Sequence, residues 1–337
     1  VSDGEGLRVH KGMGLVSEVF SEEVLERLPG PMAVGHVRYA TTGEAHVANA
    51  QPLVGMTRFG QIALAHNGNL TNTVALRQQL LGDGALVQSA TDSELILHLI
   101  ARSQAPTLED ALVEAAGKLV GAFSLAVLQR DRLVGLRDPL GIRPLVLGRW
   151  DRGWILASES AAITAAGAEP VRDVAPGEMV IIDASGLRTR SLWEVRRRAF
   201  CVFEFIYFSR PDSDAEARIV HRVRKEIGRM LAQEHPLGVD LVLPTPDSSL
   251  AAAQGYAEAA RVPYDVGLVR NAYVGRTFIQ STQALRSAGV RVKLHPIRRV
   301  MAGKRVALVD DSIVRGTTTG HVVRLLREAG AREVHVL

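Results

Sequence analysis

The spacing of the apolar runs in this sequence changes near residue 200, and that change limits the folds available to the chain. Before it, apolar runs of strand length are separated by Gly, Asn and Pro turns, as at 61–65, 123–128 and 179–182. After the linker-like segment 196–214, strands alternate with helices, at 241–243, 248–260, 306–309 and 318–329. Such alternation indicates a parallel sheet with crossover helices.

A helix in the first part is expected to begin at Thr91-Asp92-Ser93-Glu94, because apolar residues follow at helical spacing. Short strands interspersed with helices predict an α+β domain, which we place at residues 1–192. The second part predicts an α/β domain with a parallel sheet at residues 193–337. Two domains also fit the length, since 337 residues are more than one compact core usually contains.

The composition argues against several classes of protein. The longest apolar stretch, 119–128, is far shorter than the ~20 residues of a membrane helix. The single cysteine, Cys201, cannot form an internal disulfide, and no targeting segment is visible, so we expect a cytoplasmic protein with no membrane partner. The net charge of +4 comes from scattered basic residues without an aromatic stacking pattern, so no nucleic-acid partner is expected. The sequence starts at Val1 and stops straight after the strand-like run 333–336, so we expect both ends to be truncated.

The run VALVDDSIVRGTTTG, at 306–320, predicts a site for phosphate and ribose. A buried strand ends in two carboxylates, Asp310 and Asp311, and a hydroxyl-rich loop then leads into a helix. Loop hydroxyls and helix amides can converge on a phosphate, while Gly316 lets the backbone come close. Carboxylates at the carboxyl end of a parallel strand can accept sugar hydroxyls or lie near Mg²⁺. The simpler alternative is a buried strand, an Asp cap and a helix start.

This run resembles the phosphoribosylpyrophosphate (PRPP) signature of type I phosphoribosyltransferases, whereas the Walker and GxGxxG patterns are absent. The resemblance implies that Asp310 and Asp311 hold the ribose hydroxyls and lie near Mg²⁺. It also implies that the loop binds the 5-phosphate through Ser312, Arg315, Gly316, Thr317 and Thr318.

Two upstream segments fit the same ligand. Residues 243–249, LPTPDSS, follow an apolar strand and precede a helix, so their amides suit the pyrophosphate, and by resemblance Ser248 lies at its Mg²⁺ end. The basic segment 269–294 is either a surface loop or, as in this family, a lid that closes over PRPP and excludes water. Arg276 of this lid would contact PRPP, whereas Ala272 stands where relatives commonly carry Arg.

Four short clusters in the first half suggest a second site: GHVRYAT at 35–41, HNGNL at 66–70, TDSE at 91–94 and RDPLGIRPL at 137–145. Each has a simple explanation by itself. Asn67-Gly68 is a hairpin turn signal, Asp92 can cap a helix, Arg38 can form a buried ion pair and Asp138-Pro139 is typical of a turn.

Together, the order and spacing of these clusters resemble the glutaminase domain of N-terminal-nucleophile amidotransferases. Asn67 comes 29 positions after Arg38, and Asp92 comes 25 positions after Asn67. The resemblance implies that Arg38 binds the α-carboxylate of glutamine and Asp92 its α-ammonium group. Asn67 and the backbone amide of Gly68 would form the oxyanion hole.

The nucleophile of that family is the thiol of an N-terminal Cys, activated by its own α-amine. This sequence has no such residue, so we expect the glutaminase domain to lack its first strand and nucleophile, and the second domain to lack its C-terminal part. Cys201 lies at the domain junction. It is either a core residue or, as in some members of the family, a ligand of a [4Fe–4S] cluster.

The motifs HKGMGLVSEVF, DVAPGEM, IYFSRPDS and YVGRTFIQ extend the resemblance to the whole chain and select the glutamine PRPP amidotransferases. The resemblance implies an enzyme that uses glutamine and PRPP to make 5-phosphoribosylamine, glutamate and pyrophosphate at the first step of purine synthesis. It further implies Mg²⁺, a homo-oligomer and inhibition by purine nucleotides. Two alternatives remain open: an ammonia-dependent phosphoribosyltransferase without glutaminase activity, and a non-enzymatic PRPP-binding regulator.

Overall fold

The structure, a computed structural model, describes residues 1–38, 46–151, 153–195, 197–271, 294–314 and 316–337. The chain divides into two compact units, Val1–Cys201 and Val202–Leu337. The division falls after Cys201 and not after Leu192, because the backbone N–H groups of Ala199 and Cys201 donate to carbonyls of residues 140 and 142, each at 2.9 Å.

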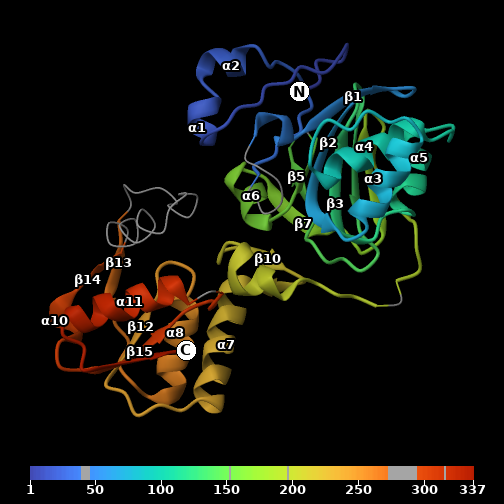
Figure 1. The fold of residues 1–337 in the computed structure, drawn as a ribbon. Coiled ribbons are helices and arrows are strands. Elements are labelled where there is room, and N and C mark those ends of the chain that lie inside the picture. Colours follow the sequence, from blue (N-terminus) through green and yellow to red (C-terminus); the bar gives the residue numbers. More distant parts are fainter. Residues whose placement is uncertain (39–45, 152, 196, 272–293, 315) are drawn as a thin grey trace. The chain divides into compact units, whose positions relative to one another are not determined.

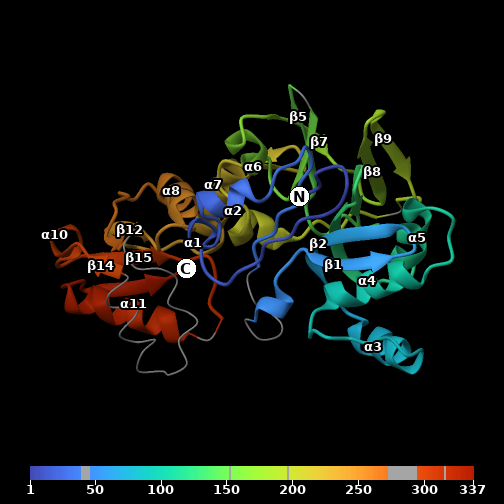
Figure 2. The same cartoon turned by 90° about the horizontal axis from the view of Figure 1, so that it is seen from above.

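The first unit is built on a six-stranded antiparallel sheet in the order β1-β2-β3-β4-β8-β9 (Figures 1 and 2). A second, three-stranded sheet has the order β6-β5-β7. The strands are β1 (Leu53–Thr57), β2 (Gly60–Leu70), β3 (Gly121–Leu128), β4 (Arg132–Arg137), β5 (Val146–Trp150), β6 (Gly153–Ala157), β7 (Glu169–Asp173), β8 (Glu178–Asp183) and β9 (Gly186–Ser191).

Helices α3, α4 and α5 lie against one face of the large sheet (Figure 2). The helices of this unit are α1 (Val16–Val19), α2 (Glu22–Glu26), η1 (Val47–Asn49), α3 (Thr73–Gly82), α4 (Asp92–Arg102), α5 (Leu108–Ala116) and α6 (Ser160–Ala165). Helix α4 begins as expected, since Oγ1 of Thr91 accepts a hydrogen bond from the N–H of Glu94. Its apolar face enters a core shared with Ile62 and Leu64 of β2.

The second unit contains a parallel sheet in the order β12-β15-β16, with helices on both faces. Side chains of β15 alternate between two cores: Val306 and Leu308 pack with α11, whereas Ala307 and Val309 pack with α8. The elements are η2 (Glu204–Phe208), β10 (Asp214–Ala215), β11 (Arg218–Ile219), α7 (Val220–Glu234), β12 (Leu241–Pro244), α8 (Leu250–Ala260), β13 (Leu268–Arg270), β14 (Leu294–Pro296), α10 (Arg298–Met301), β15 (Arg305–Val309), α11 (Thr317–Glu328) and β16 (Glu333–Val336). The predicted combination of an α+β part and a parallel α/β part is therefore confirmed.

Helices α7 and α8 approach so closely that glycine is required on both (Figure 1). A Cβ atom on Gly228 would lie 1.8 Å from the carbonyl oxygen of Ala252, and one on Gly255 would lie 1.8 Å from that of Lys225. No real Cβ contact is this short, so a larger residue at either position would force the helices apart. Among the described parts of the chain, no helix combines the length and the apolar character needed to span a bilayer.

Candidate functional site

Asn67 and Gly68 lie inside strand β2, where they pair with Ser124 and Phe123 of β3. The simpler alternative, a hairpin turn at this dipeptide, does not apply, because the strand continues to Leu70. Glycine is nevertheless required here for a steric reason. A Cβ atom on Gly68 would lie 2.1 Å from the carbonyl oxygen of Ala122.

The side chain of Asn67 is held by an arginine from the RDPLGIRPL cluster. Nε and Nη2 of Arg143 lie 3.1 and 3.0 Å from Oδ1 of Asn67, and Nδ2 of Asn67 donates to Oγ of Ser158 at 3.2 Å. Because Oδ1 accepts both bonds from the guanidinium, the orientation of the amide is defined. Arg143 lies within the RDPLGIRPL motif, but nothing in the motif itself indicates this contact.

Asp92 is the first residue of α4, and its carboxylate reaches back to the end of β2. Its Oδ2 accepts a hydrogen bond from the N–H of Leu70 at 3.0 Å. Burial acts to raise the pKa of Asp92, but the hydrogen bond and charge of His66 and the N–H of Leu70 outweigh it, so the pKa lies below its ordinary value. Asp92 is therefore a carboxylate at neutral pH, as binding an ammonium group would require.

A buried polar network around His66 ties β2 to the start of α4. Nδ1 of His66 lies 3.1 Å from Oγ of Ser93 and 3.7 Å from Oδ1 of Asp92. The side chain of Gln51 accepts from the N–H of His66 at 2.6 Å and donates to Oγ of Ser93 at 3.2 Å. The sequence patterns predict no role for His66, Ser93 or Gln51, although His66 and Ser93 adjoin Asn67 and Asp92 in their motifs.

Arg38 follows a segment that is attached to the same strand. Nε2 of His36 lies 3.1 Å from the carbonyl oxygen of His66, and Arg38 itself is half-buried. Burial lowers the pKa of His36, and the charges of His66 and Arg38 lower it further. The segment that carries Arg38 is thus bound to β2 at His66, the residue before Asn67. Residues 39–41 of the same motif lie outside the described residues.

In the second unit, β12 and β15 are parallel neighbours, so the loops that follow them meet at one edge of the sheet. The N–H of Thr245 donates to the carbonyl of Val309 at 2.9 Å, and the hydroxyl of Ser248 donates to Oδ2 of Asp311. Two segments that are far apart in the sequence, and that are both expected to bind PRPP, are therefore joined by a direct side-chain hydrogen bond.

Asp310 and Asp311 differ in their surroundings. Burial raises the pKa of Asp310, and the neighbouring charge of Asp311 raises it further. Oδ1 of Asp310 accepts from the N–H of Asp311 at 3.0 Å, and Oδ1 of Asp311 accepts from the hydroxyl of Ser312 at 2.8 Å. The edge of the sheet therefore presents two adjacent carboxylates, and both oxygens of Asp311 accept a serine hydroxyl.

The loop after β15 leads into α11 through Gly316, whose φ of +67° explains the glycine. A Cβ atom there would meet nothing within 4 Å, so the need is conformational and not a close approach within the protein. Helix α11 begins at Thr317, and Ser312, Thr317 and Thr318 are all exposed. Free amides at the start of a helix of this length suit an anion. Arg315 lies outside the described residues.

Only the ends of the expected lid belong to the described part of the chain. Residues 272–293, which include Ala272 and Arg276, lie outside it. Arg270, at the end of β13, forms an ion pair with Asp247 in the loop after β12, with Nη1 2.7 Å from Oδ2. The base of the expected lid therefore contacts the segment assigned to pyrophosphate.

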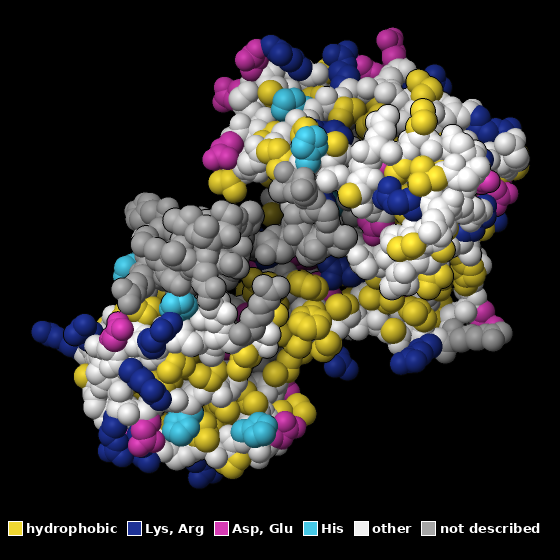
Figure 3. Space-filling view, viewed as in Figure 1, with side chains coloured by type: hydrophobic (Ala, Val, Ile, Leu, Met, Phe, Trp, Pro, Cys, Tyr) yellow, Lys and Arg dark blue, Asp and Glu magenta, His cyan; other side chains and the backbone are white. Residues whose placement is uncertain are grey.

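Cys201 is half-buried at the end of the first unit. Within the described residues, no group of three or more His, Cys, Asp or Glu side chains is arranged to hold a metal. Hydrophobic side chains gather on part of the surface of the second unit (Figure 3). Val202, Phe203, Tyr207 and Phe208, at the start of this unit, are exposed hydrophobic residues.

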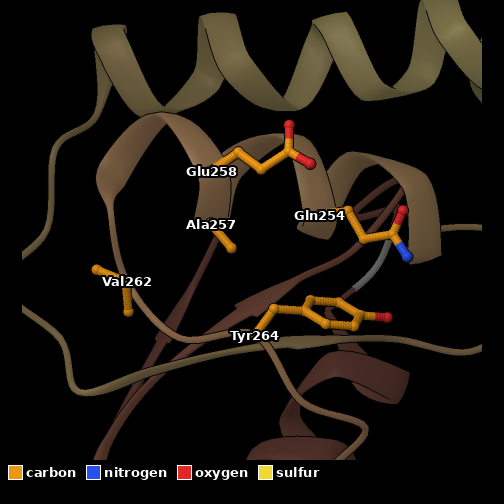
Figure 4. A pocket seen from close by; sticks show the side chains of 5 residues that line it. All are labelled: Gln254, Ala257, Glu258, Val262 and Tyr264. Atoms are coloured by element: carbon orange, nitrogen blue, oxygen red, sulfur yellow. The ribbon is translucent and has the colours of Figure 1, made fainter.

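A pocket of about 450 Å³ lies against α8, lined by Gln254, Ala257, Glu258, Val262 and Tyr264 (Figure 4). The charge of Glu258 is compensated by α7, because Lys225 and Arg229 bind its carboxylate at 2.5 and 3.0 Å. None of the residues assigned to PRPP lines this pocket, so it is separate from the predicted site.

The family model described as "Glutamine amidotransferase domain" matches residues 36–165. The chain is 50% identical over 342 residues to amidophosphoribosyltransferase of Synechococcus elongatus, covering 100% of this chain and 69% of that protein. It is 48% identical over 336 residues to the Bacillus subtilis protein of the same name, covering 99% and 71%. A solved structure described as glutamine PRPP amidotransferase from B. subtilis, complexed with ADP and GMP, has a TM-score of 0.92 at 48% identity and covers 99% of this chain and 73% of that one.

Proposed function

The chain belongs to the amidophosphoribosyltransferase family, and from that premise we propose which of its residues carry the two half-reactions. The function is glutamine-dependent amidation of PRPP in purine biosynthesis. Glutamine supplies ammonia, which replaces pyrophosphate on the ribose and gives 5-phosphoribosylamine.

For the glutamine half-reaction, we assign Arg38 to the α-carboxylate of glutamine and Asp92 to its α-ammonium group. The ionised state of Asp92 supports this, because an ammonium ion needs a carboxylate partner. Asn67 Nδ2 and the N–H of Gly68 are assigned to the oxygen that becomes negative when the side-chain amide is attacked. The attacking thiol in the family is that of an N-terminal Cys, which residues 1–337 do not include.

For the PRPP half-reaction, we assign Asp310 and Asp311 to the ribose hydroxyls and the start of α11 to the 5-phosphate, through Ser312, Gly316, Thr317 and Thr318. Arg276 and Arg315 remain assigned to PRPP by resemblance alone. The observation that carries the assignment is the hydrogen bond between Ser248 and Asp311, because it brings the expected pyrophosphate loop to the expected ribose carboxylates. Both groups come from loops at the carboxyl edge of a parallel sheet, where ligands bind in such folds.

These residues also fit Mg²⁺. Mg²⁺ prefers oxygen ligands, and in phosphate-transfer sites it is usually held by one or two carboxylates together with substrate phosphates and water. Asp310, Asp311 and Ser248 would hold it here, and when bound it would neutralise charge on the departing pyrophosphate. A [4Fe–4S] cluster needs several thiolates, and this sequence supplies only Cys201, so no part of the proposal uses a cluster.

Purine nucleotides are proposed as inhibitors, supported by the ADP and GMP in the B. subtilis relative. A homo-oligomer is proposed by resemblance. The test of the function is the formation of glutamate and pyrophosphate by the enzyme with its N-terminal Cys in place. Both products should require PRPP and Mg²⁺, and ammonium ions should replace glutamine as the nitrogen source. If PRPP releases no pyrophosphate with either glutamine or ammonium as the nitrogen source, the proposal is contradicted.

A further inference from the structure

The RDPLGIRPL motif forms a turn between β4 and β5 whose backbone is fixed by two buried charged side chains. The guanidinium of Arg137, 1% exposed, donates to three carbonyls: those of Arg143 at 2.9 Å, Val174 at 2.7 Å and Gly141 at 3.0 Å. Asp138, fully buried, accepts from the N–H groups of residues 140 and 142 at 2.9 and 3.0 Å. A turn held from within by so many charge-assisted bonds has little freedom to move.

This rigid turn presents Arg143 to the sheet. The hydroxyl of Ser124 on β3 donates to the carbonyl of Arg143 at 3.1 Å, which fixes the backbone of Arg143 against the strand that pairs with β2. The guanidinium of Arg143 then donates twice to Oδ1 of Asn67. Both the backbone and the charged end of Arg143 are therefore anchored next to Asn67.

These contacts determine which end of the Asn67 amide, the nitrogen or the oxygen, faces the oxyanion. An oxyanion hole needs an N–H donor, and an amide turned by 180° would instead present an oxygen to the developing negative charge. Two donors on Oδ1 hold the oxygen on the side of Arg143 and leave Nδ2 on the other side. Nδ2 carries two hydrogens, so one can serve Ser158 and the other an oxyanion.

We propose that Arg143 is a positioning residue for glutamine hydrolysis, which acts by fixing the amide of Asn67 with Nδ2 toward the oxyanion. The inference rests on the proposed role of Asn67. It predicts that Arg143 affects the chemical step more than glutamine binding, because the oxyanion exists only after attack. It also predicts that Arg143 has no effect of its own once Asn67 is removed.

The experiment measures glutamate release and ammonia-dependent amidation of PRPP in the enzyme with its N-terminal Cys in place. Arg143→Met should lower kcat for glutamine about 10- to 100-fold, less than the ~10²–10³ of a lost oxyanion donor, with KM changed less than about threefold. In an Asn67→Ala background the same substitution should cause no further loss. Arg143→Lys, which keeps a donor for Oδ1, should retain more activity than Arg143→Met.

Ammonia-dependent activity should be unchanged in the Arg143 variants, which shows that the second unit is folded, and thermal unfolding should show that the first unit, which contains Arg143, is folded at the assay temperature. Arg149→Met is the matched control, since Arg149 lies on β5, six residues further along the chain, and its guanidinium lies over the ring of Trp154, 4.6 Å from the centroid. If Arg143→Met unfolds the first unit, the comparison of Arg143→Lys with Arg143→Glu decides, because Lys can donate to Oδ1 of Asn67 whereas an ionised Glu can only accept, and equal activity overturns the proposal. The proposal is also overturned if the losses in kcat caused by Arg143→Met and by Asn67→Ala are additive in the double variant. Absence of turnover in the unmodified enzyme would instead overturn the proposed function.

Discussion

Arg143 and Asn67, which are 76 residues apart in the sequence, meet through two hydrogen bonds that end on a single oxygen atom. The contact connects the HNGNL and RDPLGIRPL motifs, which look unrelated when each is taken alone. Arg143, held in a rigid turn, donates to the amide oxygen of Asn67, and the amide nitrogen of Asn67 is the group that we propose to donate to the oxyanion.

Asn67→Ala should lower kcat for glutamine hydrolysis by about 10²–10³, because one donor to the oxyanion is lost. Amidation of PRPP from ammonia should be unaffected, since it does not pass through that oxyanion. Asn69→Ala is a matched control on the same strand, because Nδ2 of Asn69 contacts only the neighbouring carbonyl of Leu70 among the hydrogen bonds described for it. An equal loss with glutamine and with ammonia would contradict the assignment.

Gly68→Ala should destabilise the first unit by roughly 1–3 kcal/mol, the usual cost of overpacking. The added Cβ atom would lie 2.1 Å from the carbonyl oxygen of Ala122 and so push β2 away from β3. Chemical denaturation measures the change. Gly82→Ala provides the control, since a Cβ atom there meets nothing within 4 Å. Unchanged stability in Gly68→Ala would show that the strands adjust without cost.

The sequence predicted the elements that local pattern defines. The strands near residues 61–65, 123–128 and 179–182 and the helix start at Thr91 were all found, because side-chain period and capping are properties of neighbouring residues. The dipeptide Asn67-Gly68, a common turn signal, lies within a strand instead. Its local signal is overridden by an eight-residue ladder between β2 and β3, which runs from Ala63 to Leu70 and is not visible in the dipeptide.

The sequence indicated which residues are candidates for the two sites, but it did not indicate which of their side chains are in contact. The sequence placed Asp311 and Ser248 in separate loops, and only the pairing of β12 with β15 shows that their side chains meet. The roles of Gln51 and Arg143 depend on long-range hydrogen bonds, so no local pattern could reveal them. All of the site assignments stay predictions, and Arg276 and Arg315 also lie outside the described residues.

Asp310→Asn combined with Asp311→Asn should weaken PRPP binding about 10- to 100-fold or more, since each hydrogen bond to a charged group contributes about 1.5–3 kcal/mol. Calorimetry with PRPP and Mg²⁺ measures the affinity. Asp240→Asn is the control: this acid lies just before β12, at the opposite end of the strand, and pairs with Arg305. If the double variant binds PRPP as tightly as the unmodified protein, the carboxylates do not hold the ribose.

The negative charge of Asp310 should lower the stability of the folded protein when no ligand is bound. Burial and the charge of Asp311 raise its pKa above the ordinary 3.8. Below 3.8 the carboxyl is protonated in both the folded and the unfolded chain, so the difference in pKa has no effect. Above the raised pKa, the folded protein must hold a carboxylate that is less favourable than in the unfolded chain, so this group lowers stability as the pH rises through that window.

Asp310→Asn should therefore raise the melting temperature near neutral pH, and the gain over the unmodified protein should shrink as the pH falls toward 3.8. The carbonyl of Asn can still accept the N–H of Asp311, so the substitution removes charge without removing that bond.

Asp138→Asn is the contrasting variant. The pKa of Asp138 is also raised by burial, but both of its oxygens accept backbone N–H groups, and an amide would leave one of these unpaired. Thermal unfolding across this pH range should show a gain for Asp310→Asn and a loss for Asp138→Asn, and a pH-independent effect of Asp310→Asn would contradict the raised pKa. A gain in stability together with lost PRPP affinity would mean that Asp310 is kept charged for ligand binding at the expense of the unliganded fold.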